Sequence, residues 1–326
     1  MDRYGELRVF AGNSNPELAQ RIAAELGLVL GEVEVGRFSD GEVAVKINEN
    51  VRGADVFLIQ ATCQPSNDNL MELLILIDAA RRGSARRIVA VLPYFGYARQ
   101  DKKSRGREPI SAKLVANLIT VAGANRVVAV DLHTDQIQGF FDIPVDHLVA
   151  RQIMADYFQT AGMTGEEVVV VSPDVNAVNQ AMMLADDLHA SLAIVAKRRP
   201  RPNVAHVQEI IGDLEGRVAI MLDDMIDTAG TMVEGARGLL ERGAVEVHVA
   251  ATHGVLSGPA FERLGGAPEI KSVVITDTVP VPPERRLDKM VVLSVAPLLA
   301  EAIDRIHRDA SISVLFAPKN STPAER

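Results

Sequence analysis

Short runs of Val, Ile and Leu recur along the chain, and longer stretches with helical spacing separate them. The runs are apolar at nearly every position, which is typical of strands that are buried on both faces of a parallel sheet. The alternation of strands and helices predicts an α/β protein. Strands are predicted at 7–12, 54–60, 86–94, 126–133, 167–174, 191–197, 217–224, 245–253 and 270–277.

The stretches between these runs carry helix signals. Asn15, Pro16 and Glu17 supply a cap and a proline in the first turn, and Gly27 ends the helix that follows. Further helices are predicted over 69–82 and 110–122, each of which stops at a nearby glycine. The helix signals therefore support the α/β class independently of the strands.

The length of 326 residues suits two domains, each of which can bury its own core. Residues 81–96 resemble residues 241–256, since each segment ends a helix at Arg-Gly and then enters a strand. Chance similarity between two strand entries is the alternative. If the likeness is real, two doubly wound domains with parallel sheets follow one another. We predict domains over 1–146 and 147–326, with the boundary near 144–149 and a frayed end over 317–326.

Composition and charge limit the classes of function. Hydrophobic residues make up 48% of the chain and charged residues 24%, which is typical of a globular protein. The net charge of -9 argues against a general binder of nucleic acid or of membrane surfaces, because both are anionic. Cys63 is the single cysteine, which excludes an internal disulfide. No signal peptide or membrane-spanning run is recognised, so a cytoplasmic location is predicted.

The segment VAIMLDDMIDTAGT, residues 218–231, combines acids with small residues. The pattern predicts a buried strand that ends at Leu222 and a helix that begins near Met232. Ligands of open α/β sheets lie beyond the carboxyl ends of the strands, where a helix N-terminus can hold a phosphate. Carboxylates there can accept hydrogen bonds from sugar hydroxyls. The segment therefore predicts a phosphorylated pentose as ligand, and an acidic turn that caps a helix is the alternative.

This segment resembles the signature of phosphoribosyltransferase-fold proteins, and as DDMIDTAGT it is similar to that of ribose-phosphate pyrophosphokinases. The resemblance extends over roughly residues 7–316 and implies two tandem domains of the type I phosphoribosyltransferase-like fold. The residues that it implies for ribose 5-phosphate binding are Arg199, Asp223, Asp224, Asp227, Thr228, Ala229, Gly230 and Thr231.

Two N-terminal stretches also resemble the family. Residues 36–60 are similar to its nucleotide-binding hairpin, and residues 93–103 are similar to a loop that contacts ATP. Without the resemblance, residues 38–42 would be interpreted as a turn between strands and residues 93–103 as a solvated basic loop. The residues that the resemblance implies for ATP binding are Phe38, Asp40, Gly41, Glu42, Arg99, Gln100 and Asp101.

Metal and catalytic residues follow from the same resemblance. Asp131 and His133 would surround a magnesium ion that is bound with ATP, and His133 and Asp174 are the implied metal-binding residues. A structural histidine is the alternative for His133, because magnesium prefers oxygen ligands. Lys197 and Arg199, in KRRPRPNVAHV at 197–207, would act at the transferring phosphoryl group. An exposed linker is the alternative for that segment.

The chain departs from the family pattern at residues 176–181. Asn176 and Ala177 stand where the family has two glycines, and Gln180 or a neighbour replaces an arginine. Glycine permits a positive φ and a close approach of the backbone to a diphosphate. Either this loop is reshaped, or its residues lie in ordinary φ/ψ space.

The implied reaction transfers the β,γ-diphosphate of ATP to the C1 hydroxyl of ribose 5-phosphate, for nucleotide biosynthesis. The products are AMP and 5-phosphoribosyl 1-diphosphate. No P-loop motif is found, so ATP is held by other residues. The alternatives are a nucleobase phosphoribosyltransferase, which would lack the N-terminal half, a non-catalytic regulatory homologue, and a nucleic-acid binder built on 197–203.

The resemblance also implies a homo-oligomer, commonly a hexamer, with inorganic phosphate and ADP as allosteric effectors. Magnesium is the implied cofactor. Candidate effector residues are Arg52, Arg81 or Arg82, and Ser311 to Ser313.

Overall fold

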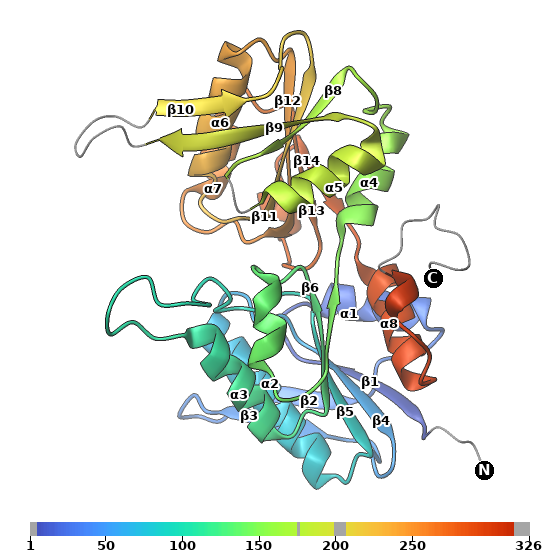
Figure 1. Ribbon diagram of the computed structural model, residues 1–326. Helices are drawn as coiled ribbons and strands as arrows, with labels where there is room; N and C mark the ends of the chain where they lie inside the picture. Colours follow the sequence, from blue (N-terminus) through green and yellow to red (C-terminus); the bar gives the residue numbers. More distant parts are fainter. Residues whose placement is uncertain (1–4, 175–176, 199–206, 316–326) are drawn as a thin grey trace. The chain divides into compact units, whose positions relative to one another are not determined.

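The computed structural model describes residues 5–174, 177–198 and 207–315. The chain forms two α/β units (Figure 1). One unit contains the described residues up to Val149 and those from Ser294 onwards, and the other contains Ala150–Leu293. The α/β class and the parallel sheets that the hydrophobic pattern predicts are confirmed.

The first unit is built on a parallel sheet of five strands whose order along the sheet follows their order in the chain. The middle strands are buried at almost every position, in accord with their continuous apolar runs. The strands are β1 (Leu7–Ala11), β4 (Asp55–Ile59), β5 (Arg87–Leu92), β6 (Arg126–Val130) and β7 (Val145–Leu148).

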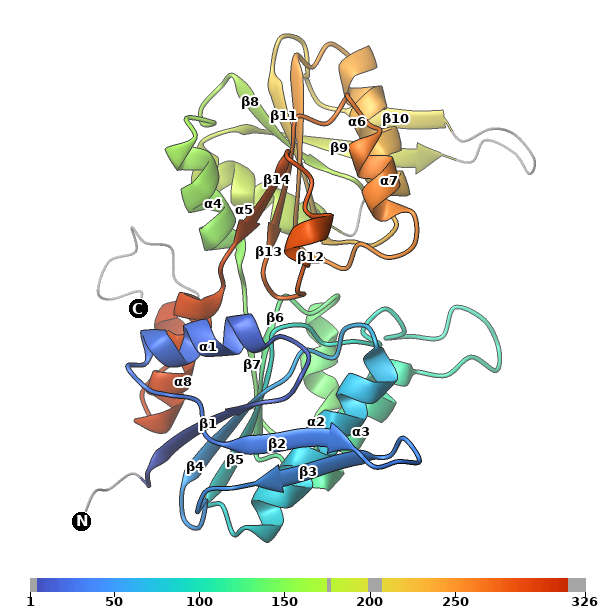
Figure 2. The same cartoon turned by 180° about the vertical axis from the view of Figure 1, so that it is seen from behind.

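Helices cover both faces of this sheet (Figures 1 and 2). Helices α2 (Ser66–Arg82) and α3 (Ser111–Ala122) pack on one face, and α1 (Pro16–Glu25) and α8 (Ala296–His307) lie together on the other. An antiparallel hairpin of β2 (Val33–Arg37) and β3 (Val43–Ile47) packs against α2. A short 3-10 helix, η1 (Asp135–Phe140), connects β6 to β7.

The predicted second domain, 147–326, differs from the observed unit at both of its ends. Residues 145–148 form an edge strand that pairs with β6 in the first sheet, so a division after residue 146 would cut this strand. Helix α8 packs against α1 in the first unit. Its apolar face, which includes Leu299 and Ile303, shows that the helix needs a partner, but the pattern does not show which one.

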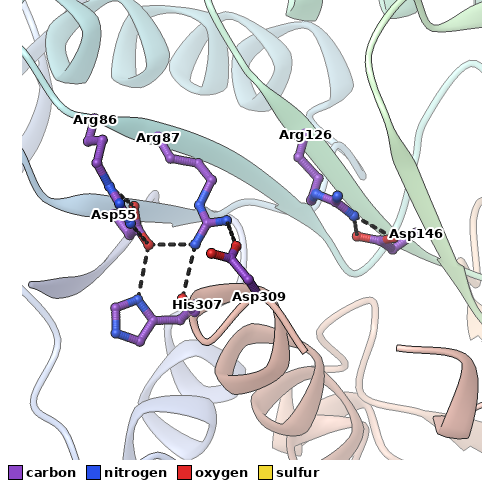
Figure 3. Close-up of polar contacts among 7 residues, drawn as sticks. All are labelled: Asp55, Arg86, Arg87, Arg126, Asp146, His307 and Asp309. Carbon is purple, nitrogen blue, oxygen red and sulfur yellow. Dashed lines mark hydrogen bonds and ion pairs between the residues drawn. The ribbon is translucent and has the colours of Figure 1, made fainter. Parts of the chain in front are cut away.

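An ion-pair network around the buried Asp55 holds the end of α8 to the first sheet (Figure 3). Asp55 is fully buried and accepts hydrogen bonds from Arg86 and Arg87. His307 lies 3.0 Å from the same carboxylate, and Arg87 also pairs with Asp309 at 2.8 Å. Charged residues from three segments that are far apart in the sequence therefore satisfy one another at the start of β4 and β5.

The second unit is built on a sheet of seven strands, in the order β10, β9, β8, β11, β12, β13 and β14. All neighbouring pairs are parallel except β9 and β10. The strand order reverses at β8 and β11. The bounds are β8 (Val168–Ser172), β9 (Ser191–Arg198), β10 (Val207–Ile211), β11 (Val218–Ile226), β12 (Glu246–Gly254), β13 (Ser272–Thr276) and β14 (Met290–Leu293).

Two helices cover each face of the second sheet, as in a doubly wound fold. Helices α4 (Arg151–Thr160) and α5 (Val178–Leu188) pack on one face, with Phe158 and Leu184 in the core. Helices α6 (Gly230–Glu241) and α7 (Ala260–Gly265) pack on the other. The remaining short helices are η2 (Pro283–Arg285) and η3 (Ser313–Leu315).

All nine predicted strands and the four predicted helices are present, with ends that differ by a few residues. Strands β2, β3, β7, β10 and β14 lie outside the nine predicted ranges, because polar residues interrupt the first four and β14 has only four residues. Within the described ranges, no helix is long and apolar enough to cross a bilayer.

Candidate active site

The acidic segment of the second unit lies at the carboxyl end of β11, where the strand order reverses. Ligands of open α/β sheets bind at such a point. Strand β11 does not end at Leu222 as predicted but continues to Ile226, because β12 runs alongside it. Asp223 pairs with Ala251, and Met225 pairs with His253. Asp223 and Asp224 are therefore held by sheet hydrogen bonds and not by a loop.

Three carboxyl groups influence one another at this edge. Burial, together with the nearby charges of Asp224 and Asp174, raises the pKa of Asp223 from 3.8 to about 8. The backbone N–H of Asp224 donates to Asp223 Oδ1 at 2.9 Å, which opposes the shift. Such a cluster is suited to bind groups that stabilise negative charge, such as hydroxyl donors or a cation.

The residues that follow, Asp227 to Thr231, form the turn into α6. Ala229 has a φ of 61°, which is left-handed, and it is the residue before the first turn of the helix. The helix begins at Gly230, two residues earlier than predicted. The first N–H groups of a helix have no acceptor inside it, and the helix dipole makes this end positive. The turn can therefore bind an anion through its backbone, as the phosphate interpretation requires.

Asp174 follows β8 on the neighbouring strand. The Ser172 hydroxyl donates to the Asp174 carbonyl at 2.6 Å, and the backbone N–H of Ala177 donates to Asp174 Oδ1 at 3.2 Å. Asp174 thus holds the residue that directly precedes α5. Ala177 has a φ of -85° and therefore lies in ordinary φ/ψ space. At this position, the alternative in which the residues keep ordinary φ/ψ values agrees with the structure. Gln180 lies in the first turn of α5, and Asn176 lies outside the described residues.

In the first unit, the predicted adenine-binding residues lie at the tip of the β2–β3 hairpin. The backbone N–H of Phe38 donates to the Glu42 carbonyl at 2.8 Å, and that of Glu42 donates to Asp40 Oδ1 at 3.1 Å. Gly41 has a φ of 94°, which glycine adopts without strain. The Phe38 side chain is 61% exposed. An exposed aromatic ring beside two carboxylates can stack on a base and accept hydrogen bonds from its amino group.

A polar network that was not predicted joins this hairpin to the buried Gln60 and Glu72. Asn13 follows β1, and its side-chain amide donates to the Val35 carbonyl of β2 at 3.1 Å and to Glu72 at 3.2 Å. Gln60, at the end of β4, donates to the same Glu72 carboxylate at 2.9 Å. The sequence signals that could have revealed the network are a glutamate on the apolar face of α2 and an Asn-Ser pair after a strand.

The loop after β5 carries Arg99, Gln100 and Asp101. The backbone carbonyl of Gln100 accepts a hydrogen bond from Ala112 N at 3.3 Å, which joins the loop to α3. Asp101 accepts a hydrogen bond from the Thr134 hydroxyl at 2.9 Å. This contact brings the predicted ATP loop beside the loop that follows β6.

The loop after β6 carries the predicted metal-binding residues of the first unit. Asp131 is buried, with a φ of 37°, and His133 is exposed. The buried His147 of β7 accepts a hydrogen bond from Leu132 N at 2.9 Å and so supports this loop. His133 and Asp174 belong to different units.

Lys197 lies in β9, where its backbone pairs with Gln208 of β10. The described part of the chain does not include its side chain or Arg199. Within that part, no three side chains of His, Cys, Asp or Glu are grouped so that they alone could hold a metal ion. Magnesium commonly keeps several waters and takes further ligands from substrate phosphates, so it does not require such a group.

The chain matches the N-terminal domain of ribose phosphate pyrophosphokinase over residues 7–123 and the phosphoribosyl synthetase-associated domain over residues 192–317. It is 61% identical to the ribose-phosphate pyrophosphokinase of Caldanaerobacter subterraneus subsp. tengcongensis, over 97% of this chain and 100% of the relative. The enzyme of the same name from Fusobacterium nucleatum is 54% identical to this chain, over 97% of this chain and 100% of the relative.

Among solved structures, the chain resembles phosphoribosylpyrophosphate synthetase from Mycobacterium smegmatis. The two share 47% identity and a TM-score of 0.88, over 94% of this chain and 100% of the other. The likeness extends over both units and supports the tandem phosphoribosyltransferase-like fold that was predicted. The chain therefore belongs to the ribose-phosphate pyrophosphokinase family.

Proposed function

We propose that this protein transfers the β,γ-diphosphate of ATP to the C1 hydroxyl of ribose 5-phosphate. The products are 5-phosphoribosyl 1-diphosphate, which serves nucleotide biosynthesis, and AMP. The observation that carries the proposal is the β11–α6 turn of a chain that matches this family along its length. At that turn, carboxylates suited to sugar hydroxyls directly precede a helix N-terminus suited to a phosphate.

In the proposed sugar site, the backbone of residues 227–231 binds the 5-phosphate, and Asp223 and Asp224 accept hydrogen bonds from ribose hydroxyls. The raised pKa of Asp223 means that its carboxyl is largely protonated near neutral pH without ligand. Hydrogen bonds from the ribose hydroxyls would stabilise the ionised Asp223 carboxylate. The carboxylate in turn accepts these hydrogen bonds more strongly than the protonated acid does. The site therefore selects a ligand that offers a phosphate and a diol together.

In the proposed nucleotide site, Phe38 stacks on adenine, and Asp40 and Glu42 accept hydrogen bonds from its amino group. Gly41 lets the turn close around the base, while Arg99, Gln100 and Asp101 contact the phosphate side of ATP and its ion. Lys197 and Arg199 neutralise charge on the transferring group. Phosphoryl transfer depends mostly on such alignment and charge neutralisation.

A magnesium ion belongs to the same proposal. Asp174 and Asp223 fit such an ion, because clustered carboxylates raise the Asp223 pKa and a dication would relieve their repulsion. His133 would contact the ion through water or contact a phosphate, and Asp174 would bind it directly. When bound, the ion would neutralise negative charge on the ATP phosphates. A cytoplasmic homo-oligomer, commonly a hexamer, with phosphate and ADP as effectors, completes the proposal.

The test is to incubate the purified protein with ATP, ribose 5-phosphate and magnesium and to follow the adenine nucleotides. AMP that forms only when the sugar is present supports the reaction. ADP in place of AMP would indicate simple phosphorylation, and no turnover with or without added phosphate would favour a non-catalytic homologue. Lys197→Ala should abolish turnover while sugar binding persists, and the exposed Lys271→Ala in the same unit serves as the matched control.

A further inference from the structure

The segment that follows β12 and includes the first turn of α7 supports the β11–α6 turn. We call residues 255–263 the backing segment. Leu256 N donates to the Ile226 carbonyl at 2.9 Å, and Ser257 N donates to the Asp227 carbonyl at 3.0 Å. The Arg263 guanidinium donates to the Thr228 carbonyl at 3.0 Å. Three consecutive carbonyl groups of the turn are thus bound by one segment.

These contacts determine where the N–H groups of the turn point. In a planar trans peptide, the carbonyl of one residue and the N–H of the next point in opposite directions. Carbonyls 226, 227 and 228 face the backing segment, so the N–H groups of residues 227, 228 and 229 face away from it. The backing segment therefore orients the donors that the proposed phosphate site uses.

Side chains of the backing segment add to this arrangement. The Ser257 hydroxyl donates to Asp227 Oδ1, which holds the first residue of the turn. A Cβ atom placed on Gly230 would lie 3.2 Å from Arg263 Nη1, so the glycine leaves room for the guanidinium to reach the turn. Leu256 and Ala260 are buried in the same core as Ile226 and Ala229. Ala229 needs such support because its left-handed φ of 61° is disfavoured for alanine.

We propose that Arg263 and Ser257 are positioning residues for the phosphate of the sugar substrate. They act through the carbonyl and carboxyl groups of the turn, and the guanidinium also adds positive charge near the phosphate. This inference rests on the proposed function of the turn. Because it concerns binding of ribose 5-phosphate, it can be tested separately from catalysis.

The experiment compares Arg263→Met, Arg263→Lys, Ser257→Ala and Ser257→Thr with the wild-type protein. Arg242→Met is the matched control, since Arg242 is an exposed arginine at the opposite end of α6. Dissociation constants for ribose 5-phosphate are measured by calorimetry without ATP, and KM values for both substrates and melting temperatures are measured in parallel.

Loss of one charge-assisted hydrogen bond should weaken ribose 5-phosphate binding about tenfold in Arg263→Met. Its KM for ribose 5-phosphate should rise by a similar factor and its KM for ATP should stay within about twofold. Ser257→Ala should weaken binding about threefold to tenfold. Arg263→Lys and Ser257→Thr should recover part of each loss, because they keep a donor.

Sugar binding that is unchanged in both Arg263→Met and Ser257→Ala would overturn the inference. Equal losses for ATP and sugar together with a lower melting temperature would also overturn it, since they would indicate a general structural role. A wild-type protein that binds the sugar but forms no AMP would refute the proposed function, while the binding series would still decide the role of the backing segment. A wild-type protein that does not bind the sugar would refute both.

Discussion

Replacement of Asp223 by asparagine should stabilise the protein against unfolding and weaken its binding of ribose 5-phosphate. Burial and the charges of Asp224 and Asp174 raise the Asp223 pKa from 3.8 to about 8. Between these two values the folded protein keeps a proton that the unfolded chain releases. The contribution of Asp223 to stability therefore falls as the pH rises from about 4 to about 8. Asparagine has a similar shape and no charge, so the variant lacks this loss.

The expected size follows from the pKa values. Each unit between the unfolded and folded pKa costs about 1.4 kcal/mol, so the wild-type carboxyl lowers the unfolding free energy by on the order of 4 kcal/mol at pH 7. The buried side-chain amide of the asparagine variant needs hydrogen-bond partners, and an incomplete set lowers the unfolding free energy by about 2 kcal/mol. We expect Asp223→Asn to gain about 2 kcal/mol at pH 7 and almost nothing at pH 5. For a unit of this size, the gain at pH 7 corresponds to a rise in Tm of roughly 4–8 °C.

Thermal unfolding is to be followed by calorimetry at pH 5, 6, 7 and 8, without ligand or metal. Asp288→Asn, an exposed position in the same unit, is the control and should change stability by less than about 0.5 kcal/mol. Sugar binding by Asp223→Asn should weaken about tenfold or more, since charged acceptors bind hydroxyls more strongly than amides. A Tm difference that is the same at pH 5 and pH 8, or a variant that is less stable at pH 7, would refute this reasoning.

Three further substitutions test other parts of the structure. Asp55→Ala leaves the partly exposed Arg86 and Arg87 without their buried carboxylate and should cost about 1–3 kcal/mol in urea unfolding; an unchanged midpoint would contradict the network's role. Ala177→Gly should lower stability by about 0.5–1 kcal/mol and leave turnover within about twofold, because Ala177 already has a negative φ. A large gain in turnover would show that this position needs a positive φ. Asn13→Ala should raise the KM for ATP about threefold to tenfold through loss of the hydrogen bond to Val35, with the KM for the sugar unchanged as the internal control.

Local patterns were sufficient to predict most of the fold. Continuous apolar runs identified the central strands, and Asn15 and Pro16 correctly placed the start of α1. The error at Leu222 has a physical cause. Two adjacent acids usually end a buried strand, but pairing with β12 extends β11 past them to Ile226. The resemblance identified the candidate site residues, and the structure describes the surroundings of most of them.

The interactions that could not be predicted join segments distant in sequence. Asn13 meets Glu72 across 59 residues, and Arg263 meets Thr228 across 35. Each of these side chains is unremarkable in its own segment. Their pairing depends on which loops the strand order brings to one edge of a sheet, and no local pattern carries that information.

Because α8 belongs to the first unit, the first unit needs both ends of the chain in order to fold, whereas the second unit is formed by one continuous segment. Residues 150–293 are a continuous insertion within the first unit, which is assembled from segments before and after them. During synthesis, the inserted unit can complete its fold as soon as it leaves the ribosome, whereas the first unit must wait for the last helix. The half that is synthesised first is therefore the half that is finished last, and a fragment ending near residue 149 would leave the face of α1 that α8 covers open to water.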